Sequence, residues 1–288
     1  SIMVPDNYTI QCRYARSLGG GFEAHPNEIW KTIDYTDRAK SCVFCGLYDA
    51  RDYYALWKHK GLAWVFWCGG DINNLINGFM LNDGKLRWVS KMPFFRPYLV
   101  KLLKKCIHWV ENEVERQALL SVGIGARVCP SFFGDVNKFK PNYFWSKNPN
   151  VYICCGRGRQ KEYGFDVIDR IAPHLPHVWF HLYGDEWQPQ SPNVIVHGRV
   201  PIELMNEQIK NMQCGLRLNE FDGFSEILAK CVLYAQYPIS RIEYPLISTY
   251  ENENELISLI ESLRRTYKPN LGARTYYMKV LNKFPWSQ

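Results

Sequence analysis

The sequence predicts an α/β fold made of two doubly wound domains. Short apolar runs rich in aromatic and β-branched residues alternate with amphipathic helical patterns along most of the 288 residues, which is typical of parallel sheets covered by helices on both faces. Hydrophobic residues make up 47% and charged residues 22% of the chain, a balance that supports a buried core and argues against disorder. The length suits two domains of ordinary size.

The first domain is expected to span residues 1–144. Its strands are predicted at 41–48, 62–68, 106–110 and 126–130. Helices are predicted at 50–59 and 112–122, the second ending before Gly123, a residue type that commonly follows a helix. Residues 138–149, rich in Pro, Asn and Lys, fit a domain boundary.

The second domain is expected to span residues 145–272. Its strands are predicted at 151–155, 178–183, 193–197, 214–218 and 237–240, with helices between them. A further helix is expected at 253–264, and a terminal one, about 273–288, is placed to pack back onto the first domain. In such folds ligands bind at the carboxyl ends of the strands, so the cleft between the domains is the expected site.

Charge and cysteine content narrow the class further. The net charge is +7, and the excess lies in residues 1–144, which hold 19 basic and 13 acidic residues. The ten cysteines fall inside apolar runs, which favours reduced core thiols over disulfides or a zinc site. In particular, Cys42 and Cys45 would point to opposite faces of a strand. No apolar run approaches the ~20 residues of a membrane span, and no signal pattern is visible, so a cytoplasmic location is expected.

A strand, an acidic loop and a helix form the strongest motif. The strand at 214–218 contains Arg217, the loop turns at Gly223, and the next helix opens with Ser225 and Glu226. Free backbone N–H groups and the positive end of the helix dipole would seat a diphosphate there. The alternative, a well-capped core helix, explains these residues equally well.

A basic loop follows the first strand of the second domain. It carries Arg157, Arg159 and Lys161. Guanidinium groups pair with phosphate oxygens through two parallel hydrogen bonds. The competing interpretation is a solvated basic loop.

The first domain supplies three weaker candidates. Gly20 lies in a glycine triplet that would allow close approach to a ligand, unless it is only a flexible connection. Asp71 follows the strand at 62–68 and is our candidate to receive or orient an acceptor hydroxyl, the alternative being a helix N-cap. His25 is a weaker candidate for the same role.

The basic excess is concentrated in residues 85–105. This segment has seven basic residues, no acidic one and several aromatic residues, and it includes Lys91 and Arg96. It could bind nucleic acid through phosphates and stacking. It could lie on an anionic membrane, burying Leu99, Val100, Leu102 and Leu103. It could also be a solvated helix whose apolar face belongs to the core.

Several stretches resemble nucleotide-sugar glycosyltransferases. Residues 217–240 resemble the donor-binding region of retaining enzymes of the GT-B fold, similar to glycosyltransferase family 4. Residues 105–139, 151–159 and 181–185 resemble other parts of that family in the same order, and residues 67–72 (WCGGDI) are similar to a W-x-G-S-D-V signature of compact members. The resemblance covers about residues 41–288.

This resemblance implies two Rossmann-like domains facing a central cleft. It implies transfer of a sugar, with retained configuration and without a metal or other cofactor, from a nucleotide-diphosphate sugar, most simply a UDP-sugar, to a hydroxyl acceptor. The implied catalytic residues are Asp71 and Asp222. The implied donor-binding residues are Gly20, Arg157, Arg159, Lys161, Arg217, Gly223, Phe224, Ser225, Glu226 and Lys230. The implied acceptor-binding residues are His25, Lys91 and Arg96.

The sequence departs from the family at one important position. The family usually has two glutamates eight residues apart, the second gripping the ribose hydroxyls, whereas this chain has Asp222 and Lys230 there. Lysine has no hydrogen-bond acceptor and cannot replace a carboxylate on a ribose. Because the surrounding loop is intact, we favour altered donor binding over loss of the donor site.

Two alternatives stay open for the function. One is a viral-type glycosyltransferase acting on hydroxymethylated pyrimidines in DNA, which would have to flip the base out of the duplex. The other is a non-catalytic protein that binds sugars or nucleotides. The acceptor is accordingly either a glycan or lipid-linked sugar at an anionic membrane surface, with peripheral membrane association, or modified DNA. No feature indicates a stable protein partner.

Overall fold

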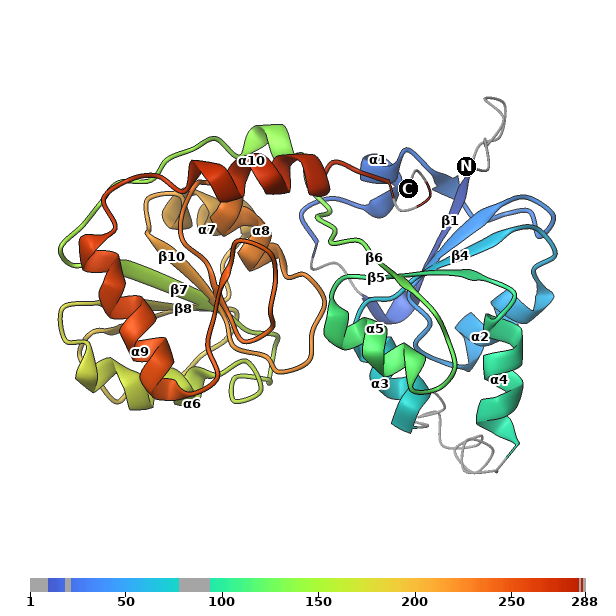
Figure 1. Cartoon of the computed structure of the whole chain (residues 1–288), viewed down its shortest axis with the longest axis horizontal. Helices are drawn as coiled ribbons and strands as arrows, with labels where there is room; N and C mark the ends of the chain where they lie inside the picture. The colour runs from blue at the N-terminus through green and yellow to red at the C-terminus, as the bar shows by residue number, and fades with distance from the viewer. Residues whose placement is uncertain (1–9, 19–21, 78–93, 285, 287–288) are drawn as a thin grey trace. The chain divides into compact units, whose positions relative to one another are not determined.

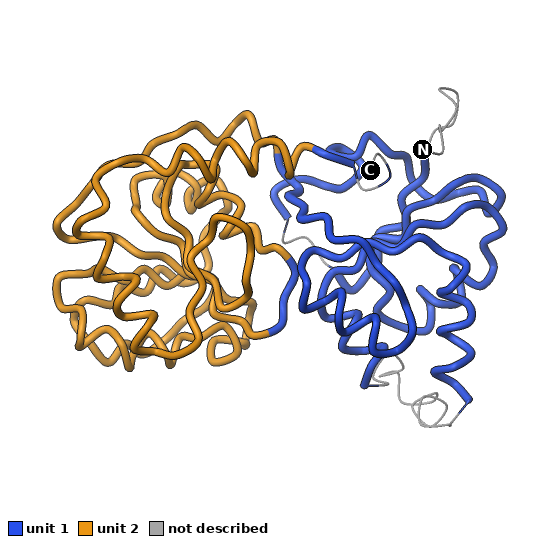
Figure 2. Tube along the Cα trace, viewed as in Figure 1, with its two compact units in different colours: residues 1–134, 221–223, 283–288 blue, residues 135–220, 224–282 orange. Residues whose placement is uncertain are grey.

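The computed structural model describes residues 10–18, 22–77, 94–284 and 286, and it divides the chain into two compact units. The first unit comprises residues 1–134, 221–223 and 283–288, and the second comprises 135–220 and 224–282 (Figure 2). Within the described residues each unit holds a six-stranded sheet in which all the paired strands are parallel. None of the helices in these ranges is long and apolar enough to cross a bilayer.

The sheet of the first unit has the strand order β2-β1-β3-β4-β5-β6. Its strands are β1 (Gln11–Tyr14), β2 (Ile33–Asp34), β3 (Cys42–Cys45), β4 (Ala63–Phe66), β5 (Ile107–Val110) and β6 (Arg127–Val128). Its helices are α1 (Pro26–Trp30), α2 (Ala50–Lys58), α3 (Gly70–Asn77), α4 (Phe95–Leu103) and α5 (Glu113–Leu120).

Both faces of this sheet are covered, as the apolar runs require. Phe44 and Val65 belong to a core formed with α2 to α5, whereas Val43 and Phe66 belong to a second core with α1. Figure 1 shows the helices of this unit around its sheet. Phe284 and Trp286, near the end of the chain, pack against this second core.

The cysteines are reduced thiols, as predicted, and seven of the ten are buried. All ten are free. Cys42 and Cys45 lie in the two different cores of the first unit, so the expected opposite orientation is confirmed. Burial raises the pKa of Cys42 to about 12, which keeps this thiol protonated and unreactive at neutral pH.

The sheet of the second unit has the strand order β12-β11-β10-β7-β8-β9. Its strands are β7 (Asn150–Cys154), β8 (Trp179–Tyr183), β9 (Val194–Gly198), β10 (Cys214–Arg217), β11 (Ile239–Ser240) and β12 (Ser248–Thr249). Its helices are α6 (Phe165–Ile171), α7 (Ile202–Ile209), α8 (Glu226–Leu233), α9 (Glu253–Glu261) and α10 (Leu271–Val280).

In this unit α6 and α9 pack on one face of the sheet, through Ile168 and Ile260 among others. On the other face, the Tyr183 hydroxyl donates a hydrogen bond to Gln208 of α7 at 2.6 Å, and the Gly215 N–H donates to the Cys231 Sγ of α8 at 3.2 Å. The sheet is therefore doubly wound, as the alternation of elements predicts.

One sequence-based interpretation of α4 is wrong. Leu99 and Leu103 are 4% and 0% exposed and pack in the core of the first unit. Their spacing of four residues puts them on the face of α4 that meets α2, α3 and the sheet, so they cannot be the side chains that enter a membrane.

Candidate functional site

The carboxyl edge of the second sheet, between β7 and β10, is the candidate site. From β7 the chain winds outward through β8 and β9 on one side and through β10, β11 and β12 on the other. The chain therefore leaves β7 and β10 in opposite directions, and such a switch point at the carboxyl ends of the strands is where doubly wound folds bind ligands.

Two arginines share an aromatic ring at this edge. Arg217 is the last residue of β10, and its guanidinium carbon lies 4.6 Å from the centre of the Tyr163 ring. The guanidinium carbon of Arg159 lies 5.3 Å from the same centre. Cation–π contacts of this kind orient guanidinium groups without using up their N–H donors. Tyr163, which sequence reasoning did not identify, is thus the platform of the site.

Lys230 adds a third cation. It lies on α8 with 4% of its surface exposed. Burial raises the pKa of Cys154 at the end of β7, and the positive charges of Arg217, Lys230 and Arg199 partly offset that effect. The ammonium of Lys230 therefore acts on the same strand end as Arg217. The departure from the family's glutamate places a positive charge at this edge.

The loops after β7 and β8 are held together by glycines. Gly184 has a φ of +104°, and a Cβ there would overlap the carbonyl oxygen of Cys155. The Gly158 N–H donates to the Asp185 carboxylate at 2.7 Å. This bond, with the N–H of Glu186 and the charges of Arg157 and Arg199, lowers the pKa of Asp185. These two contacts hold the first residues of the basic loop, 155–158, against the loop after β8.

Arg159 has an intramolecular partner in this state. Its Nε donates to Glu162 at 2.7 Å, and a second, shorter bond joins the same two side chains. Both side chains are 53% exposed. Exposed ion pairs are worth only about 0–1 kcal/mol, so a ligand phosphate could displace Glu162 at small cost.

The start of α8 combines capping and packing. The Ser225 hydroxyl accepts a hydrogen bond from the Leu228 N–H at 3.2 Å, so Ser225 is the N-cap. Phe224 is 5% exposed and stacks on Tyr277 at 5.3 Å. Phe224, which we expected to hold the donor, is a packing residue in this structure. Asn219 is 6% exposed, and within the described residues its Oδ1 has no hydrogen-bond partner.

Asp71 is enclosed by backbone groups of the first unit. It is 0% exposed. Its Oδ2 accepts from the Leu47 N–H at 3.1 Å, and its Oδ1 accepts from the N–H groups of Cys68 and Ile72, each at 3.0 Å. Burial raises its pKa to about 7. We expected a carboxylate that receives or orients an acceptor hydroxyl; instead Asp71 is buried, and its hydrogen bonds join the loops after β3 and β4.

A second group of carboxylates follows β5. The Glu111 Oε1 accepts from the Ser131 N–H at 3.1 Å and from the Ser131 hydroxyl. The Glu115 Oε1 accepts from the Glu111 N–H at 2.9 Å, and burial together with the charge of Glu111 raises the pKa of Glu115. Sequence reasoning missed this pair. The available signal was the run of polar residues, 111–113, directly after an apolar strand.

The segment Phe221–Gly223 is grouped with the first unit because it lies against this end of β5. The Asn112 Nδ2 donates to the carbonyl oxygen of Asp222 at 2.6 Å. A Cβ at position 223 would overlap the Glu111 Oε2, so a larger residue there would require the Glu111 side chain to move. The Asp222 carboxylate contributes to the raised pKa of Glu115, which puts its charge near the buried carboxylates.

The other predicted residues are scattered. His25 is exposed and caps α1 by accepting the Asn27 N–H at 3.1 Å. Arg157 and Lys161 are exposed and Glu226 is half-buried. Gly20 and Lys91 lie outside the described residues. Within the described ranges, no group of three or more His, Cys, Asp or Glu side chains is arranged to hold a metal ion.

Comparisons with known proteins establish the fold. No family model matches the chain. A stretch of 49 residues is 41% identical to part of a β-hexosaminidase of Porphyromonas gingivalis, covering 17% of this chain and 6% of that protein. That match is too short to show a family.

Solved structures are similar over most of the chain. TarM of S. aureus, solved with UDP and α-GlcNAc-glycerol, has a TM-score of 0.53 and 12% identity, over 85% of this chain and 52% of TarM. The pneumococcal O-GlcNAc transferase GtfA, solved with UDP and GlcNAc, has a TM-score of 0.53 and 10% identity, over 86% and 56%. Anabaena HepE, solved with UDP and glucose, has a TM-score of 0.56 and 11% identity, over 83% and 74%. The chain has the GT-B fold.

The GT-B assignment confirms the predicted architecture of two doubly wound units. The chain spans 52% to 56% of the length of TarM and GtfA. At 10% to 14% identity to TarM and GtfA, the likeness shows the fold. The chemistry of the site has to be argued from its own residues.

Proposed function

We propose that this GT-B chain is a glycosyltransferase that moves a sugar from a nucleotide-diphosphate sugar, a UDP-sugar by preference, to a hydroxyl acceptor. The observation that carries the proposal is the set of cations at the switch point of the second sheet: Arg217 and Arg159 on the Tyr163 ring, with Lys230 beside the end of β7. A diphosphate is the ligand group that such a set fits.

The cations would stabilise the leaving diphosphate, which is the main requirement of the reaction. As the bond from the sugar to the diphosphate breaks, negative charge develops on the leaving oxygen, and preorganised donors stabilise that charge. Arg217 is held by the aromatic ring, and Arg159 would exchange Glu162 for a phosphate oxygen. We propose that these side chains do this work without a metal ion. Added EDTA is then expected to leave turnover unchanged.

Lys230 stands where the resembling family has a glutamate, and we propose that Lys230 and Asn219 together bind the donor in another way. Lysine can donate to phosphate but cannot accept from a ribose hydroxyl, so we assign Lys230 to the diphosphate. The Oδ1 of Asn219 is a buried acceptor without a partner among the described residues. We assign it to a hydroxyl of the donor, since an unsatisfied buried acceptor costs about 1–3 kcal/mol that a ligand hydroxyl would recover.

The residues that bind the transferred sugar are assigned from the resemblance to GT-B glycosyltransferases. We propose that Asp222 accepts hydrogen bonds from the transferred sugar and that configuration is retained. Asp71 would position the loops after β3 and β4. The acceptor is either a glycan or lipid-linked sugar or modified DNA, and assays with each class identify which one is glycosylated. NMR of the product then gives the anomeric configuration of the new bond.

Calorimetric titration with UDP and a donor-hydrolysis assay test the proposal. Wild type is expected to bind UDP and to release UDP slowly from a matching UDP-sugar. Arg217→Ala should weaken UDP binding about 10- to 100-fold, the range for a charge-assisted hydrogen bond, and Arg159→Ala/Lys161→Ala should collapse turnover. Arg265→Ala, an exposed arginine of the same unit, is the control.

Two outcomes would overturn the proposal. If neither UDP nor any other nucleoside diphosphate binds, the donor site assigned here does not exist. If UDP binds but no nucleotide sugar is turned over with or without acceptor, the chain is a binding protein and the catalytic part of the proposal fails.

A further inference from the structure

The helix α4 of the first unit has two sides with different character. Leu99 and Leu103 face the core. On the solvent side Phe94 is 64% and Tyr98 is 54% exposed. Residues 94, 98 and 101 follow the spacing of one helix face, so the two aromatic rings and Lys101 form a single stripe. Large rings exposed to this extent on adjacent turns indicate an interaction surface.

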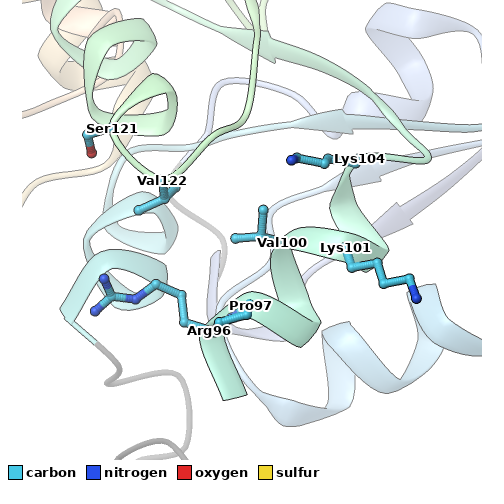
Figure 3. A pocket seen from close by; sticks show the side chains of 7 residues that line it. All are labelled: Arg96, Pro97, Val100, Lys101, Lys104, Ser121 and Val122. Atoms are coloured by element: carbon cyan, nitrogen blue, oxygen red, sulfur yellow. The ribbon is translucent and has the colours of Figure 1, made fainter. Parts of the chain in front are cut away.

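A basic hollow lies beside this stripe. Its volume is about 440 Å³. It is lined by Arg96, Pro97, Val100, Lys101, Lys104, Ser121 and Val122. Figure 3 shows Val100 and Val122 between the basic side chains of Arg96 and Lys104, with the Lys101 ammonium pointing the other way. Among the described residues that line the hollow, Arg96 and Lys104 place two cations beside the apolar floor, and none carries a carboxylate.

The hollow is partly preorganised. The Arg96 Nη2 donates to the carbonyl oxygen of Ile76 at 2.7 Å, which fixes the guanidinium at the start of α4. A guanidinium has five N–H donors, so this bond leaves most of them for an anion. Arg96 thereby contributes a fixed charge.

We propose that the α4 surface, defined by Phe94, Arg96, Tyr98, Lys101 and Lys104, binds an anionic phospholipid surface. The cations would bind headgroup phosphates, while the two rings enter the interface, where amphipathic aromatic side chains partition. This docking differs from the membrane interpretation of the sequence, because the leucines stay in the core. It does not depend on the proposed glycosyl transfer.

The aromatic rings favour lipid over duplex nucleic acid. Duplex phosphates would attract the same cations. A duplex, however, receives aromatic side chains only where its bases are unstacked. A bilayer interface accepts two neighbouring rings without such a cost, so one occupant explains both the rings and the cations.

Vesicle co-sedimentation without any nucleotide sugar tests this proposal. Vesicles of phosphatidylcholine alone and of phosphatidylcholine mixed with phosphatidylglycerol are compared at low and high salt. Wild type is expected to bind the anionic vesicles, and less at high salt. Lys101→Gln/Lys104→Gln should lower the partition coefficient roughly 10- to 30-fold. Phe94→Ala/Tyr98→Ala should lower it while leaving the salt dependence in place.

Matched variants control for charge and for folding. Lys40→Gln/Lys60→Gln removes two exposed lysines from the same unit, and Trp57→Ala removes a ring that is 50% exposed. Both are expected to bind like wild type. Thermal unfolding verifies that every variant is folded.

Three results would overturn the proposal. These are equal binding to neutral and anionic vesicles, no binding at all, or α4 variants that bind as tightly as their controls. A gel shift of duplex DNA that the α4 variants lose, with no vesicle binding, would assign the surface to nucleic acid instead.

Discussion

Lys230 is the residue whose charge most changes the chemistry of the donor edge. It is 4% exposed and lies with Arg217 near the end of β7. Lys230→Met keeps the length and apolar stem of the side chain and removes the ammonium. UDP affinity is expected to fall about 10- to 100-fold, and the ratio of UDP to UMP affinity should fall with it, because UMP lacks the second phosphate. Calorimetric titration measures both.

Lys147→Met is the matched control, since Lys147 is exposed in the same unit. It should leave both affinities unchanged. If Lys230→Met weakens UDP and UMP binding equally, or leaves both affinities unchanged, Lys230 does not contact the diphosphate.

The raised pKa of Asp71 should make the stability of the protein depend on pH. Its pKa in the folded protein is about 7, raised by burial from 3.8. Between about pH 4 and pH 7 the folded protein holds a proton that the unfolded chain has released, so this contribution to stability is present at pH 5 and lost as the pH rises through 7. Asp71→Asn removes it. The cost of the substitution in unfolding free energy is expected to be about 2 kcal/mol larger at pH 5 than at pH 8.

Denaturant titration of both proteins at the two pH values measures this difference. The substitution should destabilise at either pH, because the amide nitrogen of asparagine cannot accept a hydrogen bond, whereas both oxygens of Asp71 lie against backbone N–H donors. A cost that is constant, or larger at pH 8, would contradict a raised pKa for Asp71.

At the scale of elements, the loops after β7 and β8 depend on Gly184. Its φ is +104°, and a Cβ would overlap the Cys155 carbonyl. Gly184→Ala should therefore destabilise the protein by about 2–4 kcal/mol and weaken UDP binding, since Cys155 begins the basic loop.

Gly272 provides the comparison for this substitution. It lies in α10 with no atom within 4 Å of its Cβ position. Gly272→Ala should be neutral or stabilise by up to about 1 kcal/mol, because alanine favours the helix. Thermal and denaturant unfolding of both variants separate the two effects. Equal consequences for the two substitutions would refute the close approach at Gly184.

The long, strongly patterned elements could be predicted from the sequence. Nine of the parallel strands, the helix α2 and the helices from α4 onward follow apolar runs and helical spacing that a single sequence displays. The strands β1, β2 and β12 and the short helix α1 were not predicted. β2 and β12 have two residues each and α1 has five, too few for a period to emerge. β1 carries Gln11 and Arg13 in its four residues, which breaks the apolar pattern.

The site was predictable in kind and less so in detail. Arg217 was recognised from the pattern of a strand, a glycine turn and a helix start, and Lys230 because it replaces a glutamate of the resembling family. The pairing of Arg159 with Glu162, the Tyr163 platform and the enclosure of Asp71 depend on tertiary contacts. The same holds for the packing of the Phe224 ring on Tyr277 of α10.

At the scale of the whole molecule, the two units have different assigned roles. The second unit carries the cationic switch point, and the first carries buried carboxylates and the basic α4 surface. Within the described residues, Arg96, Lys101 and Lys104 are part of the positive excess of the first half of the sequence. We therefore expect a nucleotide to bind at the switch point of the second unit.

Hydrogen exchange with and without UDP tests this central claim most directly. UDP is expected to slow exchange at backbone amides of residues 156–164, after β7, and at the start of α8, residues 225–228. The Arg217→Ala protein should show much less protection at the same UDP concentration. UDP binding that leaves these segments unprotected, or protection confined to the first unit, would contradict the account.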